Sequence, residues 1–319
     1  MVNFYSNEYQ YNSYMKIFYI IIFSFFTTSL YADWRNQAVV KSIDDISKKT
    51  TKFVSGLIPG EGLTEVDINM RDSNYLRLNR DGDSSFQFSI LGVRDVIAKE
   101  SSNLFTQFSL HNQDINDDQR IIGNLGVGYR FLNSDQSMMF GANTFYDQDL
   151  SEGHKRIGAG LEAKAAMLNF NYNLYQKATN QKVVSGNKEQ TLSGQEYNIS
   201  SQIPYMSWAT FNYQGYRWEN EKAQQDNKGN IYSLEMALSS SVQLIAEKDK
   251  SSVDGQDNLF NYKLTYIYPP RNNKPSLLDR AIDQEAFAKK DMQAALKDKV
   301  RRNNNLAVEI QGAIIVTKK

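Results

Sequence analysis

Cysteine is absent from this chain of 319 residues. A disulfide framework, a thiolate nucleophile and a cysteine-based metal site are therefore excluded. Histidine occurs only at His111 and His154, which is not the spacing of a paired metal ligand. The sequence also lacks a phosphate-binding glycine loop and a nucleophile elbow. We therefore expect a protein that is not an enzyme, with no catalytic residue, no cofactor and no metal site.

An excess of one charge is absent as well, because 36 Lys and Arg residues balance 36 Asp and Glu residues. This balance gives no electrostatic footprint for nucleic acid, and no small-molecule substrate is evident. The mean hydropathy of -0.55 is that of a water-exposed chain. Yet the chain contains 17 Phe, 19 Tyr and 3 Trp, which is many for so few continuous apolar runs.

One apolar run stands near the N-terminus, in MKIFYIIIFSFFTTSLYAD, residues 15–33. It is shorter than the roughly 20 residues that a bilayer-spanning helix needs, and no positive stop-transfer cluster follows. We predict a signal peptide over residues 1–32, with Met15 as the true start and cleavage after Ala32. Residues 33–60 then form a short periplasmic leader, and its apolar spacing predicts an amphipathic helix that ends at Pro59. Two roles are compatible with this helix. It docks on a partner or on the main domain, or it is a solvated leader without a binding role.

Proline is scarce and falls outside the patterned region that follows. From about residue 63 the chain alternates apolar and polar residues for some 200 residues, as in LNFNYNLYQ, residues 168–176. Leu168, Phe170, Tyr172 and Leu174 occupy one face of this predicted strand, and asparagines at 169, 171 and 173 occupy the other. A proline inside such a strand would delete a ladder hydrogen bond. None of the five prolines lies inside a predicted strand.

Such strands suit a soluble sandwich or a membrane barrel, and their length and connections separate the two. Soluble strands average five or six residues, whereas these run nine to twelve, the length that crosses a bilayer at the usual barrel tilt. Long polar loops near 70–84, 113–119, 147–155, 178–192, 219–230 and 249–256 alternate with short turns. Outer-membrane barrels have this asymmetry. We predict an all-β fold, a transmembrane antiparallel barrel of twelve strands over residues 61–268, whose first strand lies at 63–69 or 74–80.

In a barrel of this kind the apolar face of each strand contacts lipid and the polar face lines the lumen, which explains the negative hydropathy. Aromatic residues near strand ends are candidates for the interfacial girdles. The candidates are Tyr129, Tyr146, Trp208, Tyr216, Trp218, Tyr266 and Tyr268. Tyr266 and Tyr268 also end the last strand, where their pattern resembles the signal that barrel-assembly machinery recognises.

Three motifs in order carry a family resemblance: Phe105–Gln107, Gly126–Arg130, and the stretch GANTFYDQDLSEGHKR, residues 141–156. They resemble the β-domain of the inverse autotransporters, the intimin and invasin adhesins of type V secretion. The loop motif of that family matches Asp147, Asp149, His154 and Arg156. A further match is VRRNNNLAVEI, residues 300–310. The resemblance implies an outer-membrane location in a Gram-negative bacterium, with outer-membrane lipid, barrel-assembly machinery and periplasmic chaperones as partners.

The resemblance also implies that the C-terminal linker turns back through the pore and carries a passenger to the cell surface. Its pore residues would be Arg302, Asn303, Asn304, Asn305 and Glu309. After Pro275, Ser276 with Asp279 resembles a capping box, and residues 277–300 are rich in helix formers. We therefore expect residues 269–319 to form a helical linker, in the pore or solvated in the periplasm, followed by a short strand.

The family's adhesins continue with long immunoglobulin-like repeats, and we expect no passenger domain in this chain. We predict a translocator and anchor whose linker threads or plugs the pore. The alternatives are a porin-like channel and a truncated remnant of an adhesin, while an outer-membrane hydrolase using the acidic loop and His154 is a distant third.

Overall fold

A computed structural model describes the barrel and most of the C-terminal region. The described residues are 52, 56, 60–72, 86–116, 118–223, 225–252, 258–272, 274–287, 291–310 and 313–315. The predicted signal peptide and the predicted leader helix, apart from its positions 52 and 56, lie outside them. Among the described residues, no helix combines the length and the apolar character needed to cross a membrane.

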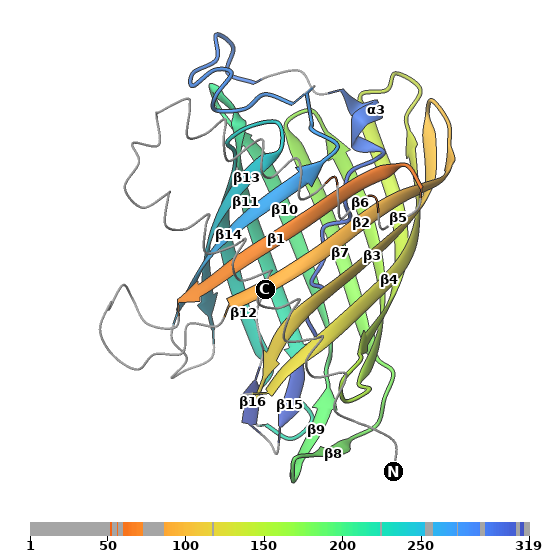
Figure 1. The fold of residues 1–319 in the computed structure, drawn as a ribbon, viewed down its shortest axis with the longest axis vertical. Helices are drawn as coiled ribbons and strands as arrows, with labels where there is room; N and C mark the ends of the chain where they lie inside the picture. Colours follow the sequence, from red (N-terminus) through yellow and green to blue (C-terminus); the bar gives the residue numbers. More distant parts are fainter. Residues whose placement is uncertain are drawn as a thin grey trace, which may run out of the picture.

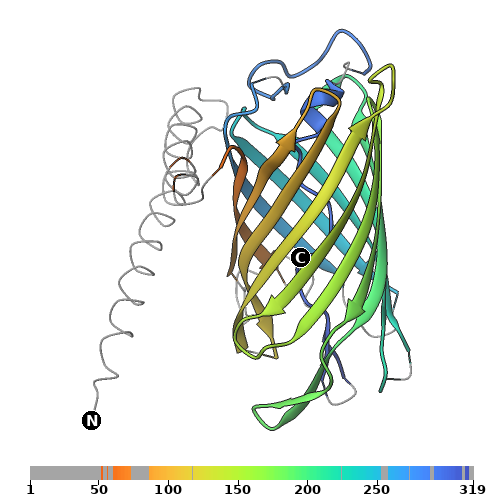
Figure 2. The ribbon, with the colours of Figure 1, turned by 90° about the vertical axis from the view of Figure 1, so that its right-hand side faces the viewer.

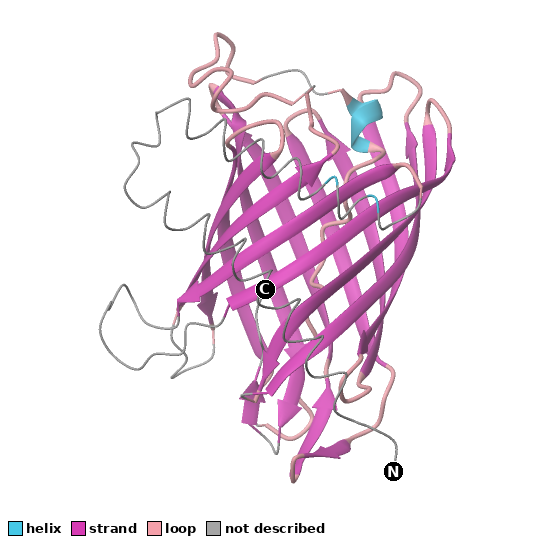
Figure 3. Cartoon of the chain, in the orientation of Figure 1, coloured by secondary structure: helices cyan, strands magenta, loops and turns pink. Residues whose placement is uncertain are grey.

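Twelve antiparallel strands close into a barrel, which dominates the molecule (Figure 1, Figure 3). In the order in which they close, each beside the next and the last beside the first, they are β1 (Gly62–Asp72), β14 (Leu259–Tyr268), β13 (Val242–Ser251), β12 (Asn227–Ala237), β11 (Met206–Glu219), β10 (Ser193–Ile203), β7 (Leu168–Lys177), β6 (Lys155–Ala165), β5 (Met138–Asp149), β4 (Asp118–Leu132), β3 (Ser102–Ile115) and β2 (Phe86–Ala98). The predicted fold class and strand number are confirmed. The first strand begins at Gly62, so the first of the two predicted positions is correct.

The two faces of the wall differ as the two-residue period predicts. In β7, Leu168 and Leu174 are 53% and 48% exposed on the outer surface, whereas Asn171 and Asn173 are 1% and 4% exposed inside. This strand therefore presents polar side chains to the interior and apolar side chains to the exterior, as lipid requires. Apolar side chains such as Phe105, Phe145 and Val300 form clusters inside the barrel as well. Trp218 is an exception to the girdle prediction, because it occupies an inward position of β11 and is buried at 1% exposure. Tyr216 has the same inward parity and is buried too.

A second, smaller sheet stands at the end of the barrel where the long connections lie (Figure 1). Its order is β16 (Ala313–Ile315), β15 (Val308–Ile310), β9 (Asn187–Thr191) and β8 (Lys182–Val184). The hairpin β8–β9 interrupts the connection between β7 and β10, for which the sequence predicts only a polar loop. Its strands, KVV and NKEQT, are too short to show a two-residue period. The pairing of β15 with β9 joins the C-terminal segment to this hairpin.

The predicted helix over residues 277–300 is wrong. The described part of that range holds only α3 (Met292–Ala295), one turn capped by Asp291. The Ser276 backbone N–H donates to Asp279 Oδ2 at 3.1 Å, as in the predicted capping box, but a turn follows instead of a helix. The reason is tertiary, because backbone groups of residues 277–286 form hydrogen bonds with the short turns of the barrel. These bonds are Leu277 N to Ala237 O, Asp283 N to Tyr205 O, and Tyr205 N to Ala286 O, at 2.8, 2.9 and 2.8 Å.

Two glycines of β4 make room for aromatic rings in the lumen. A Cβ atom built on Gly126 would lie 2.4 Å from the ring of Phe145, and one on Gly128 would lie 2.4 Å from the ring of Phe105. Both distances are far inside van der Waals contact. The rings occupy the space that side chains at these two positions would otherwise fill.

We predict that Gly126→Ala destabilises the barrel by about 1–3 kcal/mol, because the added methyl group overpacks against Phe145. The midpoint of urea unfolding in lipid vesicles measures the change. Gly123→Ala in the same strand is the control, since its Cβ would meet only Leu150 at an ordinary 3.6 Å. Equal midpoints for the two variants would contradict the prediction.

Candidate functional site in the barrel lumen

The C-terminal segment after α3 lies inside the barrel and ends in β15 at the opposite end (Figure 2). Between Leu296 and Leu306 it is not helical, and its backbone groups bond to side chains of the wall. Val300 N donates to Gln107 Oε1 at 2.7 Å, and Leu306 N donates to Gln113 Oε1 at 2.9 Å. Backbone carbonyls of the segment accept bonds from Asn103, Gln113, Asn124, Arg130, Arg156 and Asn173.

Asp147 is the centre of a network of hydrogen bonds and ion pairs inside the lumen. Arg302 reaches it through two bonds, Nη1 to Oδ1 at 2.9 Å and Nη2 to Oδ2 at 2.6 Å. Arg156 Nε donates to Oδ2 at 2.9 Å, and Asn124 Nδ2 donates to Oδ1 at 2.8 Å. Asp147 and Arg156 are fully buried, and Arg302 is 3% exposed. One carboxylate therefore faces two guanidinium groups, one from the wall and one from the C-terminal segment.

Aromatic rings support both arginines. The Arg302 guanidinium lies 4.1 Å from the ring centre of Phe145, the residue that covers Gly126. The Arg156 guanidinium lies 4.2 Å from the ring centre of Tyr175 and 5.5 Å from that of Trp218. Cation–π attraction of this kind favours a charged group that has lost part of its water.

A second anchor, which no sequence motif indicated, joins Glu196 and Tyr175. The backbone N–H of Asn303 donates to Glu196 Oε1 at 2.8 Å and to Tyr175 Oη at 2.9 Å. Tyr175, Asn173 and Gln214 all donate to the same carboxylate. The only sequence signal for this anchor was that the charged residue Glu196 occupies an inward position of β10, beside the inward asparagines of the neighbouring strand β7.

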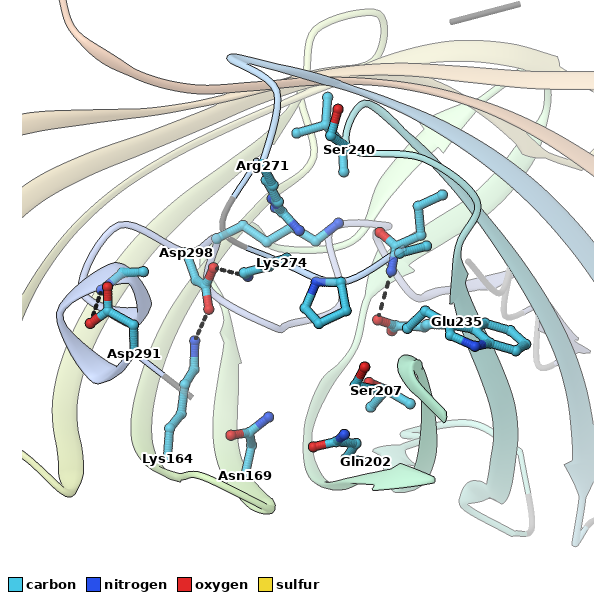
Figure 4. Close-up of a pocket in the computed structure, with 18 of the residues that line it drawn as sticks. Lys164, Asn169, Gln202, Ser207, Glu235, Ser240, Arg271, Lys274, Asp291 and Asp298 are labelled. Carbon is cyan, nitrogen blue, oxygen red and sulfur yellow. Dashed lines mark hydrogen bonds and ion pairs between the residues drawn. The ribbon is translucent and has the colours of Figure 1, made fainter. Parts of the chain in front are cut away.

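At the short-turn end the segment is held by ion pairs around a cavity of about 210 Å³ (Figure 4). Asp298 pairs with Lys274 at 2.9 Å and with Lys164 at 3.5 Å. Arg301 pairs with Glu235 of β12 at 2.6 Å. Figure 4 shows Lys164, Lys274 and Asp298 converging on one side of the cavity, with Glu235 opposite.

At the long-connection end a buried cluster fixes the β8–β9 hairpin. Arg120 donates to both carboxylate oxygens of Glu189, at 2.6 and 2.7 Å. His154 Nε2 lies 3.2 Å from Glu189, and Asp149 lies 3.5 Å from Arg120. Burial, the largest influence, lowers the pKa of His154 below its usual 6.5, although Glu189 and Asp149 act against it.

The predicted site residues thus fall into separate groups. Asp147, Arg156 and Arg302 meet in the centre, whereas Asp149 and His154 belong to the cluster at the long-connection end. Asn303, Asn304 and Asn305 lie in the lumen, where Asn304 O accepts from Asn124. Glu309 accepts bonds from the backbone of the β11–β12 connection, at residues 221–223. Tyr266 and Tyr268 pair with neighbours in the wall, away from all of these groups.

The arrangement holds the C-terminal segment against the barrel wall. Within the described residues, no cluster of His, Asp and Glu has the arrangement of a metal site. Asp147 and Glu189, the carboxylates at the two buried clusters, are both occupied by guanidinium groups. A closed barrel with an apolar exterior, a polar lumen and short turns at one end defines an outer-membrane β-barrel protein.

Comparison with known proteins identifies the family. The family described as "Inverse autotransporter, beta-domain" matches residues 35–304, most of the chain. The chain therefore belongs to the inverse autotransporter β-domain family, as the sequence motifs predicted.

Two relatives come from Escherichia coli K12. An attaching and effacing protein homolog is 32% identical over 147 residues, which are 45% of this chain and 48% of that protein. The uncharacterized protein YchO is 25% identical over 205 residues, 63% of this chain and 40% of that protein. The chain spans about half the length of the curated relatives that it matches, or less. A solved structure from work on in-meso crystallization of membrane proteins shares the fold, with a TM-score of 0.61, 18% identity, and coverage of 78% of this chain and 99% of that one.

We predict that Asp147→Asn destabilises the protein by about 3–5 kcal/mol, because Arg156 and Arg302 would lose the buried carboxylate that they share. Urea unfolding in vesicles, followed by the fluorescence of the three tryptophans, measures the change. Asp135→Asn, in an exposed short turn, is the matched control. A loss for Asp147→Asn no larger than for the control would show that the ion pairs contribute little.

We also predict that His154 makes stability depend on pH. Its folded pKa is lowered, so its contribution to folding is complete above pH 6.5 and is lost as the pH falls below that value. Between about pH 7 and pH 5, the wild type should lose more stability than His154→Gln, which cannot take up the proton. Parallel stability profiles for the two proteins would refute this assignment.

Proposed function

We propose that the protein is a translocator and anchor of the inverse autotransporter type, whose C-terminal linker threads the pore and emerges at the cell surface. The observation that carries the proposal is the set of wall side chains bonded to the backbone of residues 296–306. Ten steps reach at most about 33–36 Å when fully extended, which is comparable to the hydrocarbon thickness of a membrane. A segment held in this way connects one side of the membrane to the other.

The contacts suit a path for an extended chain. Amide and guanidinium groups of the wall bond to backbone atoms, which every residue has, and so they can act on many different sequences. Arg302 adds one contact that depends on sequence, its pair with Asp147. The β15–β9 pairing then extends the segment with a strand at the outer end.

The same proposal includes the partners. Outer-membrane lipid would surround the apolar outer face, and the barrel-assembly machinery would recognise the last strand, β14, through Tyr266 and Tyr268. Periplasmic chaperones would carry the chain before insertion. We propose a role without enzymatic activity, in which Asp147, Asp149 and His154 fix the fold of the lumen and of the hairpin.

The second candidate is a porin-like channel, and the polar cavity at the short-turn end favours it. The two functions differ in what residues 276–319 do. If this tail is a plug, its deletion should raise single-channel conductance in planar bilayers sharply. If conductance is nearly unchanged, the protein is a channel whose tail does not obstruct it.

The experiment that tests the proposal places a protease-sensitive tag after Lys319 and measures its accessibility in intact cells. We expect cleavage from outside, with the barrel in the outer-membrane fraction. The same tag inserted at the short turn 133–137 is the control, because it should become accessible only after permeabilisation. A terminal tag that is protected in a correctly inserted protein would overturn surface display.

A further inference from the structure

The outer wall of the barrel carries a basic surface near the long connections. We define it as Arg217 in β11, Lys228 in β12, and Lys248 and Lys250 in β13. Arg217 lies directly opposite Lys228 in the register, while Lys250 lies opposite Asn230 and Lys248 opposite Tyr232. Their neighbours along the strands, Trp218, Asn227 and Asp249, are buried on the lumen side. By strand alternation the four basic residues therefore face the membrane side.

These charges are only partly balanced. Asp226 pairs with Arg217, with Nε to Oδ2 at 2.7 Å. Lys248 lies over the ring of Phe260 at 5.4 Å. Within the described part of the chain, neither Lys228 nor Lys250 lies within ion-pair distance of a carboxylate. Like charges on facing strands destabilise a sheet unless an opposite charge joins them. The surface is complementary to an anion with more than one negative charge.

A row of tyrosines marks the membrane interface just below these charges. Tyr197, Tyr213 and Tyr232 pack in sequence across β10–β12, with ring centres 5.9 and 5.5 Å apart. Along each of β11, β12 and β13, the basic residues lie at the level of this row or beyond it, on the side of the long connections. Tyrosine prefers the boundary between hydrocarbon and headgroups. The basic residues therefore lie at the level of the lipid headgroups.

The wall is also hollowed at this place. A depression of about 260 Å³ is lined by Gln195, Arg217, Lys228 and Asn230 among others. Gly215 leaves the outer face of β11 without a side chain, and the ring of Tyr197 lies over it. Amide groups, cationic groups and a flat aromatic surface thus meet in one exposed site.

We propose that this basic surface binds the phosphorylated glycolipid of the outer leaflet, the lipid A portion of lipopolysaccharide. Long connections of outer-membrane barrels face outward, which places the site in that leaflet. Lys228, Lys250 and Arg217 bind the phosphates, Gln195 and Asn230 contact sugar hydroxyls, and acyl chains pack on the tyrosine row. The inference goes beyond the translocator function and does not depend on it.

The test uses the full-length protein in detergent, with native mass spectrometry and bisphosphorylated lipid A as the probe. The variant is Lys228→Gln with Lys250→Gln. Each basic residue near an anionic surface contributes appreciably to lipid binding, so we expect the double variant to bind at least about tenfold more weakly. The matched control is Lys188→Gln with Lys222→Gln, which removes the same charge from exposed positions at the same end of the barrel, off the outer wall.

Further binding measurements with other anions show whether the surface recognises lipid A in particular. Lipid A with one phosphate should bind more weakly than the bisphosphorylated form, and inorganic phosphate should not compete at millimolar concentration. Equal lipid A binding by the double variant and its control would overturn the proposal. Equal binding of phosphatidylglycerol and lipid A to the wild type would overturn it too, because the surface would then be a general anion-binding patch.

Discussion

The constraint on which this structure depends is that backbone polar groups inside a membrane protein need partners within the protein. The wall meets it by closure, because β1 pairs with β14 and leaves no edge. Residues 296–306 cannot meet it in the same way, since they belong to no strand or helix. After the turn at residues 296–298, many of their N–H and C=O groups bond to side chains of the wall, which explains why the lumen is rich in asparagine and glutamine. Gln107 and Gln113 show the pattern, each accepting a backbone N–H of the segment.

The charges of the lumen follow a related rule, since a buried ion is stable only when it is paired and hydrogen-bonded. Asp147 meets both conditions, with Arg156, Arg302 and Asn124 as donors. Packing contributes as well, because Gly126 leaves room for the ring of Phe145 that lies under Arg302. A glycine in the wall, an aromatic ring and an arginine of the C-terminal segment thus form one unit. The family's Gly-x-Gly-x-Arg motif therefore has a steric reason in this chain.

Much of the fold could be predicted from sequence because each strand repeats one physical pattern. Leu168 and Asn171 differ in solvent transfer free energy, and a period of two assigns them to opposite faces. The prediction of a helix over residues 277–300 was wrong because helix propensity is only a weak preference. Hydrogen bonds to residues far away in the sequence, such as Leu277 N to Ala237 O, outweigh it. The pair of Asp147 and Arg302 spans 155 positions, so only the resemblance drew attention to both residues. Glu196 and Tyr175 carried no motif and were missed.

The lumen makes two kinds of contact with the C-terminal segment, which differ in whether they depend on the residue type. Bonds from Gln107 or Gln113 to backbone atoms are the same for any residue of the segment, and they favour an extended chain without fixing which residue lies where. The ion pair of Arg302 with Asp147 exists in one register only, because a shift of one residue would place Asn303 or Arg301 opposite the carboxylate. Arg301 already pairs with Glu235, so a shift would also break that contact. Contacts that tolerate any sequence allow a chain to pass, and sequence-dependent ion pairs such as those of Arg301, Arg302 and Asp298 decide where it rests.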